Sequence, residues 1–102
     1  MKEKKILSLL GLCRRAGKLV SGQEKVESGI RDGQALLVVI AADASDNTRK
    51  KFTDKCSFYE VPCYCVFTKE EIGQAIGYEE RATLAVTDEG FADKIMQLFD
   101  SP

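Results

Sequence analysis

Residues 35–42 read ALLVVIAA, and this stretch decides the fold of the chain. No polar residue interrupts it, whereas a strand with one face in water alternates apolar and polar side chains. The stretch is therefore expected to be a central strand that is covered on both faces. Such a strand needs helices above and below its sheet, which predicts a three-layer α/β/α sandwich.

The residues before this strand predict two amphipathic helices joined by a short extended segment. Residues 3–15 carry apolar side chains at the spacing i, i+3, i+4, i+7, as on one face of a helix. Residues 19–20 are a short extended segment. Ser21 and Glu24 stand three positions apart, as in a capping box, and predict a second helix that Gly33 ends.

The residues after the central strand predict the remaining layers. In chain order they are a helix capped by Asp43 or Ser45, a buried strand at 63–67, a helix with a Thr68–Glu71 capping box that ends at Gly77, a strand at 82–87 and a helix capped by Asp88. Helices thus alternate with strands along the whole chain, as in α/β folds.

The composition is that of a small globular domain. The chain has 102 residues, of which 44% are hydrophobic and 30% charged, and this length suffices for a core without metal or disulfide bonds. We expect residues 1–102 to form a single domain. No apolar stretch approaches the roughly 18 residues of a membrane span, and no signal cleavage site is visible, so a cytoplasmic protein without a membrane partner is expected.

The net charge of −1 hides an uneven distribution. Residues 1–25 hold seven cations against two anions, whereas residues 69–102 hold three cations against eight acids. This pattern permits a local site for a polyanion and disfavours non-specific, charge-driven binding of nucleic acid. The alternative is that both segments simply form solvated helix faces.

The residue types present exclude most simple enzyme classes. The chain has no histidine, which removes the usual general base, the usual metal ligand and the Ser-His and Cys-His dyads. The four cysteines lack paired Cys-x-x-Cys spacing, so buried cysteines are favoured over a zinc site, and disulfides are not expected. No metal, cofactor or small-molecule substrate is predicted.

Three cations precede the second predicted helix and outline an anion site. Arg14, Arg15 and Lys18 lie just upstream of the helix start. Gly22 removes a side chain there, which lets a phosphate or a base approach the backbone N–H groups of the first turn. Alternatively, the Ser-Gly pair serves only as a helix cap.

Two further stretches lie where ligands of open α/β sheets gather. Asp43 directly follows the central strand, a place for a phospho-acceptor or metal-binding aspartate, although helix capping is the commoner explanation. Tyr78 and Arg81 lie in an exposed turn and are the residue types that form a stacking platform for an unpaired base. Glu79 and Glu80, which separate them, argue the other way.

Four motifs in a fixed order carry a family resemblance. They are AGKLVSG at 16–22, LVVIAADAS at 37–45, IGQAIG at 72–77 and ATLAVTD at 82–88. In these motifs the chain resembles the kink-turn RNA-binding ribosomal proteins of the L7Ae/L30e type, and within them the small bacterial YlxQ-type members, over residues 4–97. The resemblance implies an α/β/α sandwich around a mixed four-stranded sheet, with residues 19–20 as a short edge strand.

The resemblance also implies an RNA site. In this family the helix that begins at the motif's glycine reads sharply bent RNA, and the loop before the last strand lies near the bulged nucleotides. By position, Gly22 matches that glycine, while Glu24, Lys25 and Ser28 fall on the other RNA-reading positions. The resemblance and the local chemistry together predict these RNA-binding residues: Arg14, Arg15, Lys18, Gly22, Gln23, Glu24, Lys25, Ser28, Tyr78, Glu79, Glu80 and Arg81.

The sequence therefore predicts a non-catalytic, ribosome-associated RNA-binding protein. Its expected partners are structured RNA, either ribosomal RNA or another kink-turn RNA, and the ribosome. The alternative is a protein-interaction or regulatory adaptor that uses the acidic carboxyl-terminal third against a basic partner. An enzymatic function based on Asp43 ranks third, because the chain lacks histidine and a second carboxylate in the same strand-end segment.

Overall fold

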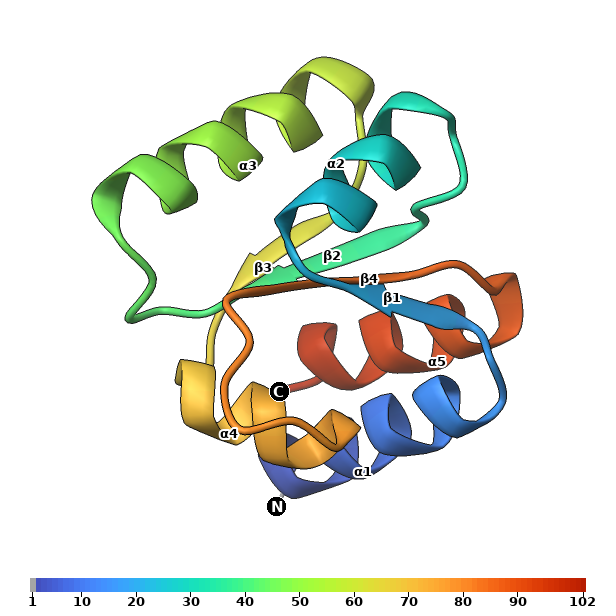
Figure 1. The fold of residues 1–102 in the computed structure, drawn as a ribbon. Coiled ribbons are helices and arrows are strands. Elements are labelled where there is room, and N and C mark those ends of the chain that lie inside the picture. Colours follow the sequence, from blue (N-terminus) through green and yellow to red (C-terminus); the bar gives the residue numbers. More distant parts are fainter. Residues whose placement is uncertain (1) are drawn as a thin grey trace.

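The computed structural model describes residues 2–102, which form helices and strands in alternation (Figure 1). The elements are α1 (Lys2–Arg15), β1 (Leu19–Ser21), α2 (Gln23–Arg31), β2 (Leu37–Ile40), α3 (Asp46–Tyr59), β3 (Cys63–Cys65), α4 (Lys69–Ile76), β4 (Thr83–Val86) and α5 (Glu89–Asp100). Their order is the one predicted from the hydrophobic pattern.

The strands form one mixed sheet in the order β1-β4-β2-β3. β2 runs parallel to β3 and antiparallel to β4, and β1 runs antiparallel to β4. All four residues of β2 are buried, as its uniformly apolar sequence predicts for a strand inside a sheet.

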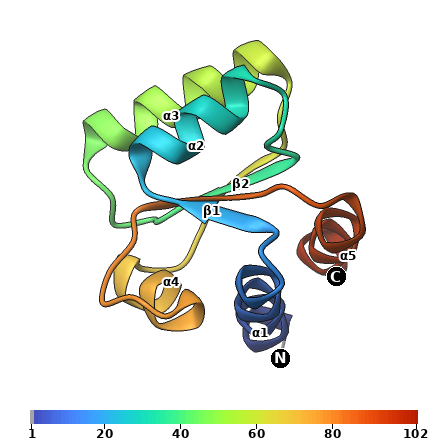
Figure 2. The same ribbon diagram turned by 45° about the vertical axis from the view of Figure 1, so that its right-hand side comes forward.

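Two layers of helices enclose this sheet. α2 and α3 cover one face, and α1, α4 and α5 cover the other (Figures 1 and 2). Ile6 and Leu10 of α1 are fully buried, as are Ile30 of α2 and Phe52 of α3. The predicted α/β/α sandwich with a mixed four-stranded sheet is confirmed.

Most helix caps follow the local sequence. Ser45 accepts a hydrogen bond from the Thr48 N–H at the start of α3. At α4 both halves of the predicted capping box are present, between Thr68 and Glu71. Asp88 caps α5 by accepting from the Phe91 N–H.

The capping box predicted at the start of α2 is wrong. Ser21 is the last residue of β1, where it pairs with Leu84, so its side chain does not cap the helix. The N-cap is Gly22, with φ +93° and ψ 151° and no side-chain hydrogen bond. That conformation is one that only glycine adopts readily, so Gly22 is fixed by the turn from strand to helix.

The strand predicted as buried at 63–67 is shorter and lies at an edge. β3 pairs only with β2, and its outer side has no neighbouring strand among residues 2–102. Cys63 is therefore half-buried and Cys65 is exposed, contrary to the expected buried cysteines, while Cys13 and Cys56 are buried as expected. Within residues 2–102, no group of three or more His, Cys, Asp or Glu side chains is arranged to hold a metal ion.

The charge segregation along the sequence does not become a separation in space. The basic helix α1 packs directly against the acidic helix α5 on one face of the sheet (Figure 2). Lys2 Nζ donates to the carbonyls of Phe99 and Ser101 at 3.2 and 2.9 Å, which joins the two ends of the described chain. None of the helices within residues 2–102 has the length and apolar character needed to cross a membrane.

Candidate nucleic-acid interface

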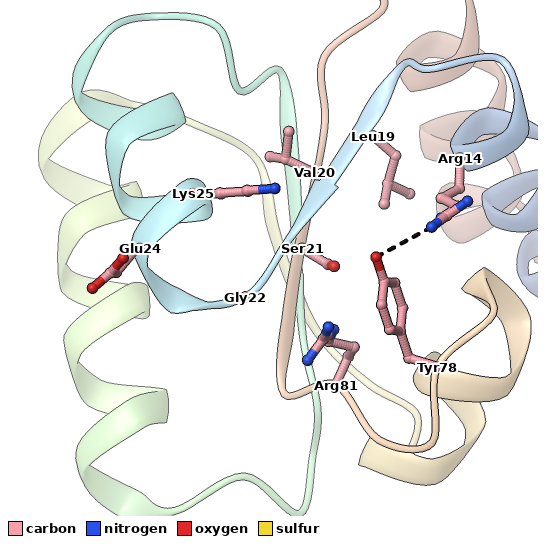
Figure 3. A pocket seen from close by; sticks show the side chains of 9 residues that line it. All are labelled: Arg14, Leu19, Val20, Ser21, Gly22, Glu24, Lys25, Tyr78 and Arg81. Atoms are coloured by element: carbon pink, nitrogen blue, oxygen red, sulfur yellow. Dashed lines mark hydrogen bonds between the residues drawn. The ribbon is translucent and has the colours of Figure 1, made fainter.

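Two segments that the sequence analysis treated separately meet at one groove. It runs along β1, between the start of α2 and the loop that joins α4 to β4, with a volume of about 450 Å³ (Figure 3). The residues that line this β1 groove are Arg14, Leu19, Val20, Ser21, Gly22, Glu24, Lys25, Tyr78 and Arg81. The groove therefore brings together predicted site residues from positions 14–25 and 78–81.

Two arginines hold Tyr78 at one side of the groove. Arg14 Nη2 donates to the Tyr78 hydroxyl at 3.2 Å, and the Arg81 guanidinium lies 3.9 Å from the centre of the ring (Figure 3). The hydrogen bond from Arg14, with Arg81 close by, lowers the pKa of the Tyr78 hydroxyl. Arg81 Nε is buried and has no hydrogen-bond partner within residues 2–102, so part of this guanidinium is not used by the fold.

The loop that carries Tyr78 and Arg81 is fixed to α4 at two points. The Tyr78 N–H donates to the Gly73 carbonyl at 2.7 Å, and the Arg81 N–H donates to the Lys69 carbonyl at 3.0 Å. Gly73 has no side chain, which lets the loop backbone lie directly on the helix. Main-chain contacts therefore hold Tyr78 and the Arg81 guanidinium that stacks on its ring in place.

Asp43 supports the same region through one of its carboxylate oxygens. Its Oδ1 accepts from the Lys69 N–H at 2.8 Å, at the first residue of α4. Asp43 or Ser45 was expected to cap α3, and Ser45 is the residue that does so. Asp43 accepts a hydrogen bond at the start of α4 instead. Asp43 thus links the end of β2 to the helix on which the Tyr78 loop rests.

The start of α2 forms the other side of the groove. The Lys25 side chain extends over β1 near Val20. Glu24 also lines the groove, but its carboxylate is directed away from β1 (Figure 3). The first N–H groups of α2 have no side-chain cap, in contrast to α3, α4 and α5. The Gly22 N–H is not one of these free donors, because it donates to the Thr83 carbonyl at 3.2 Å.

Six of the predicted residues do not line the groove: Arg15, Lys18, Gln23, Ser28, Glu79 and Glu80. Gln23 donates to the Thr48 hydroxyl at 3.3 Å and so turns toward α3. Ser28 accepts from Arg31 at 3.3 Å on the far part of α2. The two glutamates line a second hollow together with Gln74 and Tyr78. Tyr78 therefore borders both hollows, whereas Glu79 and Glu80 line only the second one.

The residues that sequence reasoning missed are those of β1. Leu19, Val20 and Ser21 line the groove, although the sequence predicted only an extended segment at 19–20 and a helix cap at Ser21. These three residues lie in the sequence between the predicted site residues at 14–18 and those at 22–28. That position indicates a place in the site only once it is known that β1 lies at the edge of the sheet.

Comparison with known proteins assigns the chain to a family. Residues 4–96 match the model of the Ribosomal protein L7Ae/L30e/S12e/Gadd45 family. The chain belongs to this family. The resemblance stated from the four sequence motifs is confirmed.

Individual relatives agree with this assignment. RNA-binding protein YlxQ of Bacillus subtilis (strain 168) is 50% identical over 92 residues, which cover 90% of this chain and 92% of that protein. A solved structure of a protein with unknown function from Bacillus halodurans C has a TM-score of 0.91 and 42% identity, and covers 95% of this chain and 98% of that one.

A more distant structure shares the fold. The Giardia lamblia 15.5kD RNA binding protein has a TM-score of 0.82 at 19% identity, and the match covers 95% of this chain and 83% of that one. The family description and the relatives' names describe ribosomal or RNA-binding proteins and not enzymes, which confirms the non-catalytic character predicted from the sequence.

Proposed function

We propose that this protein binds structured RNA in the β1 groove. The observation that carries the proposal is that Arg14 and Arg81 contact the exposed ring of Tyr78 in a groove that Lys25 also lines. Cations contact phosphates, and aromatic and guanidinium planes stack on unpaired bases. RNA binding by the YlxQ relative, which is 50% identical, supports the same function.

The preferred RNA is kinked or bulged, as in a kink-turn. A regular A-form helix hides its base edges in a deep, narrow groove, whereas a kink or bulge exposes unpaired bases. The β1 groove is short and its cations are few, so it suits a bent segment with a flipped base better than a long duplex. In this proposal the whole chain acts as one RNA-binding domain in the cytoplasm.

The ribosome is the proposed site of action. The family to which the chain belongs is described as one of ribosomal proteins, and ribosomal RNA is rich in bent, non-duplex elements. Arg15 and Lys18 lie outside the groove but close to it in sequence, so they are proposed to contact phosphates of the flanking RNA. Gln23, Ser28, Glu79 and Glu80 are assigned to its periphery.

A binding experiment with matched RNAs tests the proposal. The probe is a fluorescently labelled RNA hairpin with a kink-turn, and the control is the same hairpin with its bulge filled to a continuous duplex. We expect the kink-turn hairpin to bind at least about tenfold more tightly, a difference of about 1.4 kcal/mol. Equal affinity for the two RNAs contradicts the kink preference, and binding to neither contradicts RNA recognition itself.

Two charge reversals locate the site on the protein. Lys25 is exposed at the groove, and Lys94 is exposed on the distal helix α5. Lys25→Glu should weaken binding by at least about 1.4 kcal/mol through one lost charge-assisted contact plus repulsion. Lys94→Glu changes the net charge equally and should have little effect. An equal loss in both variants would mean that binding depends on overall charge and not on the groove.

A further inference from the structure

We propose that the open edge of β1 reads an unpaired nucleobase through the main-chain N–H and C=O groups of Leu19 and Ser21. The inference rests on the proposed RNA-binding function and specifies which groups of the site distinguish one base from another. It follows from the hydrogen-bond pattern of β1, the position of this strand in the sheet and the side chains on either side of it.

The pairing of β1 with β4 fixes the direction of each peptide group. The Gly22 N–H donates to the Thr83 carbonyl at 3.2 Å, and the Thr87 N–H donates to the Lys18 carbonyl at 2.9 Å. In an antiparallel pair the hydrogen-bonded residues alternate along the strand. Val20, which pairs with Ala85, therefore also faces β4.

Leu19 and Ser21 consequently direct both of their backbone groups away from the sheet. β1 is the first strand in the sheet order, so no other strand of the described chain covers this edge. Both residues line the β1 groove. No side chain within residues 2–102 forms a hydrogen bond with the N–H or C=O group of either residue. The groove wall thus presents two donor–acceptor pairs, at positions i and i+2.

A nucleobase matches such a pair. Adenine, for example, carries the N6 amino donor next to a ring-nitrogen acceptor. An N–H and a C=O of the same residue satisfy both groups at once, and main-chain groups lose no side-chain entropy when they do so. The edge therefore offers base discrimination that the cationic side chains, which contact phosphates, do not provide.

The flanking side chains supply the rest of a nucleotide site. In Figure 3 the Leu19 and Ser21 side chains lie on the Tyr78 side of the strand, and Val20 and Lys25 lie on the other. A base whose edge meets β1 can stack on the Arg81–Tyr78 pair, and Lys25 is placed for its phosphate. The volume of about 450 Å³ is at the low end of the roughly 300–1,000 Å³ of ligand pockets, which suits a single nucleotide.

An added peptide strand is the less suitable occupant of the same edge. Strand addition depends on a row of main-chain hydrogen bonds, and β1 has only three residues, two of which face outward. The arginines and the lysine around the edge also favour a phosphate-bearing ligand over a neutral backbone. The nucleobase is therefore the occupant that fits both the short edge and its charge.

Amide hydrogen exchange followed by NMR tests the inference directly. In the free protein the Val20 and Gly22 amides should be protected, whereas those of Leu19 and Ser21 should exchange rapidly. With the kink-turn hairpin bound, we expect exchange at Leu19 and Ser21 to slow by at least about tenfold. If the hairpin binds but these two amides stay unprotected, the inference is overturned while the proposed function stands.

Substitution at Ser21 provides a second readout. Ser21→Pro removes the outward N–H, and proline is tolerated where a strand's N–H faces away from the ladder. Ser21→Ala removes only the hydroxyl and is the matched control. We expect Ser21→Pro to bind the hairpin at least about tenfold more weakly than Ser21→Ala, which keeps the backbone N–H. A folded Ser21→Pro variant with unchanged affinity overturns the inference. If that variant does not fold, the exchange measurement on the unsubstituted protein decides.

Discussion

Replacement of Gly73 by alanine should disturb the groove from beneath. A Cβ at this position would lie 2.6 Å from the Glu79 carbonyl oxygen and 2.7 Å from Glu80 Cα, which are main-chain atoms of the loop that carries Tyr78 and Arg81. The loop must therefore move. Overpacking of this kind costs about 1–3 kcal/mol, against about 1 kcal/mol gained from alanine in a helix. At roughly 4–8 °C per kcal/mol, the net loss of up to about 2 kcal/mol lowers the Tm by up to about 15 °C.

Gly29→Ala is the matched control for this prediction. Gly29 is also helical, but its Cβ would meet the Ala35 Cβ at 3.6 Å, an ordinary contact. Thermal unfolding should show a Tm raised by a few degrees for Gly29→Ala and lowered for Gly73→Ala. In the hairpin assay only Gly73→Ala should lose affinity, by about tenfold or more, because Tyr78 and Arg81 are displaced. A Tm that rises in both variants would refute the close packing of the loop on α4.

Four other measurements address charge, backbone, ionisation and the cysteines. With three cations in the groove and two beside it, log affinity for RNA should fall with log salt with a slope of about −2 to −5, and Lys25→Gln should reduce that slope by about 1; a flat dependence would contradict phosphate contacts. Gly22→Ala should lower the free energy of unfolding by about 1–3 kcal/mol in urea titrations, because φ is +93° although no atom lies within 4 Å of the new Cβ. Because hydrogen bonding by Arg14 stabilises the phenolate and lowers the pKa of Tyr78, Arg14→Gln should raise that pKa in a spectrophotometric titration, and an unchanged curve would show that this contact is absent in solution. The protein should stay folded, by circular dichroism, in chelator and reductant, whereas one equivalent of tightly bound zinc would contradict the expected role of the cysteines as free thiols.

The features that could be predicted depend on neighbours in the sequence. The Thr68–Glu71 capping box and the Asp88 cap each involve residues three positions apart, so their contacts form wherever the segment becomes helical. The uniformly apolar sequence around β2 was sufficient by itself to predict a strand that is covered on both faces. For the same reason, most element types were predicted correctly while their ends differed by a few residues.

The features that failed depend on distant pairing. Ser21 has a good capping sequence, but its pairing with Leu84 places it in a strand. Cys65 follows an apolar segment, but the strand order leaves it at an exposed edge. The groove itself needs Arg14 and Arg81 to meet, and nothing local to either residue indicates their common contact with Tyr78.

The charges of the groove explain how a protein with net charge −1 can select RNA by shape. Arg81 belongs to the acidic third of the sequence, and its neighbours Glu79 and Glu80 face a separate hollow next to the groove. A polyanion that approaches without fitting the groove therefore meets carboxylates as well as cations, and its long-range attraction is weak. Only a ligand that enters the groove reaches its three cations together with the Tyr78 ring, while Glu79 and Glu80 line the neighbouring hollow. Straight duplexes should for this reason bind poorly even at low salt, and the acidic flank contributes to selectivity by limiting attraction to them.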